Sequence, residues 1–107
     1  MYAKCQQFKF HDFNSAKIAA SYCGDILGKQ IDDLKMAGLN IFLGKDGELS
    51  IIVKFEGIED LKAYDKHSRD LRKDLNSSFN FTEVKYSGVC VFSYENEATD
   101  ISISTNW

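Results

Sequence analysis

The sequence contains no proline, only two histidines and a single tryptophan, Trp107. Its three cysteines, Cys5, Cys23 and Cys90, are odd in number and have no Cys-x-x-Cys spacing, which argues against a disulfide framework and against a zinc site. Cysteines without a disulfide partner are usually small, buried hydrophobic residues of proteins in a reducing compartment. We therefore expect a cytoplasmic protein that binds no metal.

Long apolar runs are also missing. Nothing approaches 18 consecutive apolar residues, and the first ten residues lack the apolar centre of a signal peptide, so we expect no membrane partner. The 13 Lys and Arg residues are interspersed with 16 Asp and Glu residues, for a net charge of −3. This pattern gives no concentrated basic stretch, so we expect no nucleic-acid partner. Without linkers, repeats or low-complexity segments, residues 1–107 are predicted to form a single domain.

The first half of the chain has the apolar periodicity of a strand and then that of a helix. Residues 2–10 read as an amphipathic strand. Asn14 or Ser15 then offers an N-cap for a helix that ends near Gly28. In this helix one row carries Ile18, Tyr22 and Ile26, and the neighbouring row carries Ala19, Cys23 and Leu27. Residues 29–37 are either a short helical turn or an irregular connector.

The second half begins with two apolar runs, residues 39–44 and 49–55, and the Lys-Asp-Gly-Glu between them predicts a hairpin. A helix follows over about residues 58–76. Residues 79–95 are predicted to be extended with a bulge or bend at Gly88, and residues 99–107 to add an edge strand. The order βαββαβ predicts an α+β, ferredoxin-like fold, in which a four-stranded antiparallel sheet carries both helices on one face.

The two faces of this sheet are both rich in apolar residues. In residues 49–55 one face carries Leu49, Ile51, Val53 and Phe55, and the other carries Ser50, Ile52 and Lys54. In residues 39–44, Leu39, Ile41 and Leu43 alternate with Asn40 and Phe42, so neither face is consistently polar. A sheet face open to water should be polar at every second position. We therefore expect a homodimer in which a second copy covers this face; the alternative is scattered aromatic residues on the surface.

The helix over residues 58–76 has an inward stripe and a histidine on its flank. The stripe contains Ile58, Leu61, Tyr64, Ser68, Leu71 and Leu75. His67 falls beside it, at the boundary between core and solvent. Three interpretations remain open: a half-exposed surface histidine, a residue lining a ligand cleft, or a general acid–base group.

Gly38 before the second strand, "KDGE" in the hairpin, and "VKFEGIEDLKAY" with the following "YDKH" resemble the dimeric α/β-barrel superfamily over residues 2–86. This superfamily includes antibiotic-biosynthesis monooxygenases and stress-responsive barrel domains. The resemblance implies two ferredoxin-like protomers packed sheet to sheet, with a ligand cleft between helices and sheet in each.

The sequence also departs from these relatives. Ser68 and Asp70 stand where stress-responsive domains have a proline and a second histidine. Haem-degrading relatives use an asparagine on the first strand and a tryptophan, whereas this strand has Gln6 and Gln7. Flavin-binding light sensors need a glutamine in the third strand, which is missing from residues 49–55. We therefore expect no cofactor.

The aromatic residues can fill a core or line a cleft. In the second interpretation the protein binds a small hydrophobic ligand, similar to a fatty acid or a polyketide. The ligand-binding residues would be Tyr22, Asn40, Phe42, Tyr64, His67 and Leu71. The alternative is a cofactor-independent monooxygenase, isomerase or cyclase for an aromatic or polyketide substrate, with His67 and Tyr64 as the candidate catalytic residues. A third possibility is a structural or regulatory module with a closed core.

Overall fold

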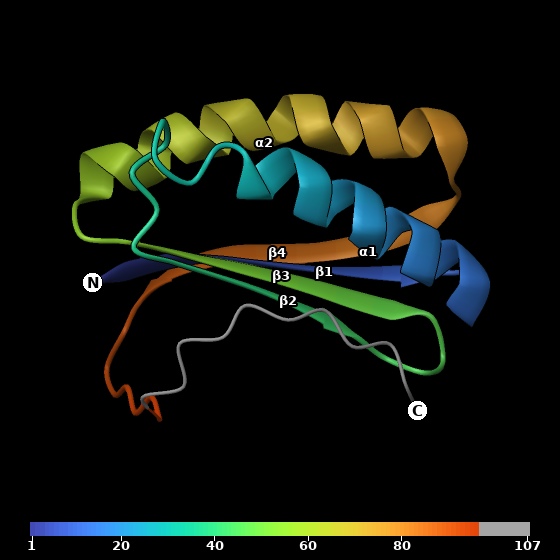
Figure 1. Cartoon of the computed structure of the whole chain (residues 1–107), viewed down its shortest axis with the longest axis horizontal. Coiled ribbons are helices and arrows are strands. Elements are labelled where there is room, and N and C mark those ends of the chain that lie inside the picture. Colours follow the sequence, from blue (N-terminus) through green and yellow to red (C-terminus); the bar gives the residue numbers. More distant parts are fainter. Residues whose placement is uncertain (97–107) are drawn as a thin grey trace.

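The computed structural model describes residues 1–96 and shows one antiparallel sheet with both helices on the same face (Figure 1). The strands follow the order β2-β3-β1-β4 across the sheet. Along the chain the elements are β1 (Tyr2–Phe10), α1 (Phe13–Gly28), β2 (Gly38–Leu43), β3 (Glu48–Phe55), α2 (Ile58–Ser78) and β4 (Phe81–Val89). This arrangement confirms the predicted ferredoxin-like βαββαβ fold. The edge strand predicted over residues 99–107 lies outside the described residues.

The core lies between the sheet and the helices and follows from the period-two pattern of the central strands. In β3, Leu49, Ile51, Val53 and Phe55 are fully buried on the face that carries the helices. In β1, Phe8 and Phe10 are buried on this same face. Alternation along a strand sends every second side chain to one side, so the register fixes which residues can meet the helices.

The predicted hairpin joins β2 to β3, and its pairing brings Leu43 opposite Leu49. The turn contains Gly47 with φ +96°, and a Cβ atom there would lie 3.0 Å from the carbonyl oxygen of Phe10. Only glycine adopts this backbone conformation without strain so close to another chain segment. The residues "KDGE" therefore contain the turn of the hairpin, as predicted.

Helix α1 differs from the prediction at its N-cap, and the structure decides which of its two rows is buried. It begins after Asp12, whose side chain accepts a hydrogen bond of 2.7 Å from the backbone N–H of Ser15, so neither Asn14 nor Ser15 is the N-cap. Its buried row contains Ala16, Ala19, Cys23 and Leu27. Ile18 and Tyr22, by contrast, are 54% and 37% exposed. The sheet already carries bulky aromatic side chains, so the row of mostly small residues fits against it.

Helix α2 buries Leu61, Tyr64, Ser68, Leu71 and Leu75, as predicted. Ile58, however, is exposed. It precedes Tyr64 by six residues, which at about 100° per residue places the two side chains about 120° apart. Ile58 therefore does not belong to the inward stripe.

Strand β4 is regular, and the predicted bulge at Gly88 is wrong. Its pairing with β1 runs without interruption from Phe10 opposite Phe81 to Tyr2 opposite Val89, and Gly88 lies opposite Ala3. The strand ends at Val89, so the expected extension to residue 95 does not form. Phe81 contributes to an aromatic cluster with edge-to-face and tilted ring contacts to Phe8 and Phe10.

Candidate functional site

A cluster of polar side chains lies in the layer between the sheet and α2. It starts from β1, where Lys4 and Gln6 are buried and share the helix-facing side with Phe8 and Phe10. Unpaired polar groups are costly in such a place, and a charge is more costly still. Lys4 and Gln6 each have polar partners on neighbouring elements.

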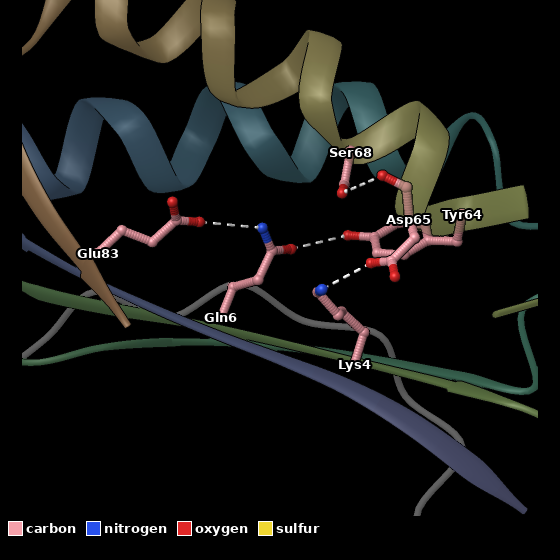
Figure 2. Close-up of polar contacts among 6 residues, drawn as sticks. All are labelled: Lys4, Gln6, Tyr64, Asp65, Ser68 and Glu83. Atoms are coloured by element: carbon pink, nitrogen blue, oxygen red, sulfur yellow. Dashed lines mark hydrogen bonds and ion pairs between the residues drawn. The ribbon is translucent and has the colours of Figure 1, made fainter. Parts of the chain in front are cut away.

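Lys4 pairs with the first of these partners, Asp65 of α2. Its Nζ atom lies 2.6 Å from Oδ1 of Asp65 (Figure 2). The lysine side chain is 8% exposed, whereas the aspartate side chain is 37% exposed. The hydroxyl of Ser68, one turn further along α2, donates to the backbone carbonyl of Asp65 at 2.9 Å. The ammonium group is thus buried, and its counter-ion lies at the boundary with solvent.

Gln6 connects α2 to β4. The Tyr64 hydroxyl donates to Oε1 of Gln6 at 3.2 Å, and Nε2 of Gln6 donates to Oε2 of Glu83 at 3.3 Å (Figure 2). Glu83 is itself almost completely buried, and its other oxygen accepts a hydrogen bond from Nε of Arg72. The chain of contacts therefore runs from the interior at Tyr64 to the surface at Arg72.

Burial determines the proton chemistry available in this cluster. Desolvation raises the pKa of Tyr64 well above its ordinary value of 10.0, with smaller contributions from Cys23 and Asp65. Burial likewise raises the pKa of the Cys23 thiol to about 12. Near neutral pH both groups stay protonated. Tyr64 is consequently a hydrogen-bond donor in this structure and a poor general base.

His67 lies on the opposite flank of α2 from Asp65. It precedes Asp74 by seven residues, about two helical turns, so the two residues share one side of the helix. Asp74 accepts a hydrogen bond of 3.2 Å from the Tyr22 hydroxyl of α1, so this side faces α1. Among residues 1–96, no hydrogen bond or ion pair involves the imidazole of His67. It is half-buried and is not joined to Tyr64.

A groove of about 480 Å³ lies between α1 and the C-terminal end of α2. Its apolar lining comes from Ile18, Tyr22, Leu75 and Phe79, and its polar lining from Asp74, Ser77 and Ser78. This volume falls within the range of small-molecule sites. Ile18 and Tyr22 line this groove because α1 buries its other row, which contains Ala19 and Cys23, against the sheet.

The six residues predicted to bind a ligand are not brought together within one protomer. Tyr64 and Leu71 are buried under α2, and Tyr22 lines the groove between the helices. Asn40 and Phe42 lie on the far face of the sheet, because their partners in β3, Ile52 and Ser50, alternate with the buried residues of that strand. The sheet therefore separates these two from the other four.

The far face of the sheet, called the open face below, carries several apolar side chains. Register places Asn40, Ile52, Cys5 and Tyr86 in one row across the sheet. The next row has Phe42 and Val84 at its two ends, with Ser50 and Gln7 between them. Phe42, Val84 and Tyr86 are all exposed, Val84 to 70%. Neither helix covers this face (Figure 1). An apolar surface of this kind is typical of an interaction site.

Sequence reasoning missed Lys4, Gln6 and Glu83. For the two residues of β1 a signal was present, since they have the same parity as Phe8 and Phe10 in an amphipathic strand. A strand that buries its phenylalanines must bury Lys4 and Gln6 too, and such residues need partners. Glu83 carried the same signal, since it has the same parity as Phe81 in β4, but its partner Arg72 could be identified only once α2 was placed beside the edge of the sheet.

Two further properties concern the residues that the structure describes. Among residues 1–96, no group of three or more His, Cys, Asp or Glu side chains is arranged to hold a metal ion. No helix in this part of the chain combines the length and apolarity needed to cross a membrane.

No protein-family model matches the chain, and no curated protein matches it. Solved structures do resemble it. A dimeric ferredoxin-like protein from an uncultured marine organism is 14% identical, with a TM-score of 0.66 over 90% of this chain and 100% of the other. The ActVA-Orf6 monooxygenase of Streptomyces coelicolor, solved in complex with nanaomycin D, is 12% identical, with a TM-score of 0.64 over 88% and 92% of the two chains.

A de novo designed protein with a ferredoxin fold is also similar. It is 18% identical, with a TM-score of 0.56 over 94% of this chain and 96% of the other. At such low identities the likeness establishes the fold alone, which is ferredoxin-like. The fold is shared by a natural dimer, a monooxygenase and a designed protein, so function must be argued from the residues.

Proposed function

We propose that the chain is a homodimer of single-domain protomers, each spanning residues 1–107, that binds a small hydrophobic molecule. The groove between α1 and α2 would be the binding site. The observation that carries this proposal is the position of Ile18 and Tyr22, which are exposed on α1 directly beside Leu75 and Phe79. Binding of an apolar molecule would remove these side chains from water, at about 25 cal/mol per Å² of buried apolar surface.

The lining of the groove narrows the chemistry of the ligand. Asp74 lies at its polar side and would repel a carboxylate, whereas Ser77 and Ser78 offer hydroxyl groups. An elongated, uncharged molecule with hydroxyl or carbonyl oxygens fits better than an ionised fatty acid. A polyketide-like compound has this character. A fatty acid is therefore the less favoured of the two ligand types expected from the sequence.

Displacement of a neutral fluorescent probe, N-phenyl-1-naphthylamine, tests this proposal. Decanol is expected to displace the probe more effectively than decanoate, because the alcohol avoids repulsion by Asp74. Ile18→Lys should weaken probe binding about tenfold or more, since it places a charge in the groove. Ile31→Lys is the matched control, because Ile31 is an exposed isoleucine outside the groove.

Equal effects of Ile18→Lys and Ile31→Lys would rule out this groove as the binding site. Complete lack of probe binding, with no small molecule found by mass spectrometry of the purified protein, would contradict ligand binding itself. That result would favour a structural or regulatory module.

The homodimer rests on the apolar residues of the open face. Phe42, Val84 and Tyr86 would pack against their counterparts in the second copy, as expected from the dimeric neighbour of the same fold. Val84→Lys is expected to shift the protein from about twice the mass of the 12.2 kDa chain to the monomer in sedimentation at micromolar concentration. Ile31→Lys should leave the mass unchanged. A monomeric wild-type protein would contradict the dimer.

A second candidate is a cofactor-independent monooxygenase, isomerase or cyclase acting on an aromatic or polyketide substrate. It is favoured by the neighbour that is named a monooxygenase and by the buried hydrogen bond between Tyr64 and Gln6. Tyr64 would act as a hydrogen-bond donor, and His67 would move a proton from the α1 side of the helix. Tyr64→Phe and His67→Ala should then abolish turnover while far-UV circular dichroism stays unchanged; unaltered turnover would end this candidate. A cytoplasmic location stays a prediction.

A further inference from the structure

A second groove, of about 660 Å³, lies on the other side of α2, between that helix and the edge strand β4. It is called the basic groove below. Its lining consists of Lys66, Arg69, Asp70, Arg72, Lys73, Glu83 and Lys85. These residues come from α2 and from β4, the strand that follows it in the chain.

Positive charge is concentrated in the basic groove. It gathers five of the 13 Lys and Arg residues but only two of the 16 Asp and Glu residues, in a chain with net charge −3. One of the two acids, Glu83, already accepts hydrogen bonds from Arg72 and Gln6. The groove therefore has an excess of cations that its own carboxylates do not neutralise.

The cations of the groove differ in how they are held. Arg72 is fixed by the nearly buried Glu83, and its guanidinium carbon lies 5.9 Å from the ring centre of Phe81. Within residues 1–96, no ion pair involves Lys66, Arg69, Lys73 or Lys85. These five exposed cations repel one another through solvent, and an anion bound between them would relieve that repulsion.

We propose that the basic groove binds a small molecule carrying a phosphate group. A phosphate offers several acceptor oxygens to lysine ammonium groups and can be bound by two nitrogens of an arginine. No aromatic side chain lines the groove, so it lacks the aromatic platforms on which single-stranded nucleic acids stack their bases, and this favours a small anion over a nucleic acid. Because it lies on the helix side of the sheet, the groove stays accessible in a dimer formed through the open face.

Titration of the full-length protein with inorganic pyrophosphate at low ionic strength, followed by NMR, tests the proposal. Saturable shifts are expected at the backbone amides of α2 and β4 that line the basic groove. The variant Arg69→Glu/Lys73→Glu should weaken binding about tenfold or more. The control Lys17→Glu/Lys29→Glu alters the net charge equally at exposed residues of α1 and its C-cap, and should change the affinity less than about twofold.

The variant Arg69→Gln/Lys73→Gln adds no negative charge and provides a second test if the double charge reversal does not fold. A phosphorylated metabolite and a phosphorylated lipid headgroup share the proposed chemistry. Binding of pyrophosphate alone indicates the metabolite, whereas binding only of vesicles that contain phosphorylated inositol lipids indicates the headgroup.

Three results would overturn the proposal. One is the lack of saturable binding to either pyrophosphate or vesicles. Another is an equal loss of affinity in the α1 control, which would show an effect of net charge alone. The last is binding to single-stranded oligonucleotides that tightens with their length, which would assign the groove to nucleic acid. The proposal is independent of the hydrophobic ligand, so either can fail without the other.

Discussion

Removing Lys4 and removing Asp65 from their ion pair should affect the stability of the protein to different extents. Asp65→Ala removes the partly exposed member and leaves a buried ammonium group without its carboxylate. Lys4→Met removes the buried charge but keeps a flexible apolar side chain of similar length in the core. We expect Asp65→Ala to lower the free energy of unfolding by more than Lys4→Met does.

The exposed fractions of the two side chains set the magnitude. Removing one partner of a fully buried pair costs about 3–5 kcal/mol. Asp65 is 37% exposed, so water already screens this pair and can reach the ammonium group after the substitution. We therefore expect a loss of about 2–3 kcal/mol for Asp65→Ala and of about 1 kcal/mol or less for Lys4→Met, in which a well-packed apolar side chain replaces the ion.

Equilibrium unfolding in urea, at one fixed protomer concentration, measures these differences. The concentration must be the same for all variants because dissociation of the proposed dimer would contribute to the apparent stability. The double variant Lys4→Met/Asp65→Ala should be about as stable as Lys4→Met, since the aspartate has no charge left to neutralise. A larger loss for Lys4→Met than for Asp65→Ala would refute this reasoning.

Three other predictions concern the core and the hairpin. Tyr64→Phe removes the donor to the buried Oε1 of Gln6 and should cost about 1–2 kcal/mol in urea unfolding, whereas an unchanged stability would show that water replaces the hydroxyl. Burial raises the pKa of Cys23 to about 12, from 9.0 for an ordinary thiol. The unfolded chain then loses this proton first, so the free energy of unfolding should fall as the pH rises from about 9 towards 12, and Cys23→Ala should weaken that dependence. Gly47→Ala should lower the melting temperature because φ is +96° there, whereas Gly28→Ala, with no atom within 4 Å of the new methyl group, should not; equal melting temperatures would contradict the strained turn.

The order of elements could be predicted because local pattern alone decides it. Alternating apolar residues define β1 and β3, the Lys-Asp-Gly-Glu turn defines the hairpin, and the apolar stripe of α2 defines its buried side. Once this order is known, few topologies bury all the apolar faces. The ferredoxin-like sheet follows from these constraints.

Which side of each helix or strand packs against its neighbours could not be predicted in every case, because this depends on the side chains of the element that faces it. The sequence offers two adjacent rows on α1, and only the bulky aromatic side chains of the sheet and of α2 determine that the row with Ala16, Ala19 and Cys23 is buried. The same choice exposes Ile18 and Tyr22 and creates the groove between the helices. The pairing of Gly88 with Ala3 likewise shows that a glycine in a strand does not by itself produce a bulge.

The sequence by itself determined the order of the strands and helices, the ferredoxin-like topology and the presence of apolar residues on both faces of the sheet. The tertiary structure decided which polar and charged residues meet. It placed Asn40 and Phe42 across the sheet from Tyr64, joined Gln6 to Tyr64 and Glu83, and gathered the cations of α2 with Lys85 of β4. Along the chain these cations are diluted by acidic neighbours, and they form a basic groove only because α2 crosses beside the edge strand.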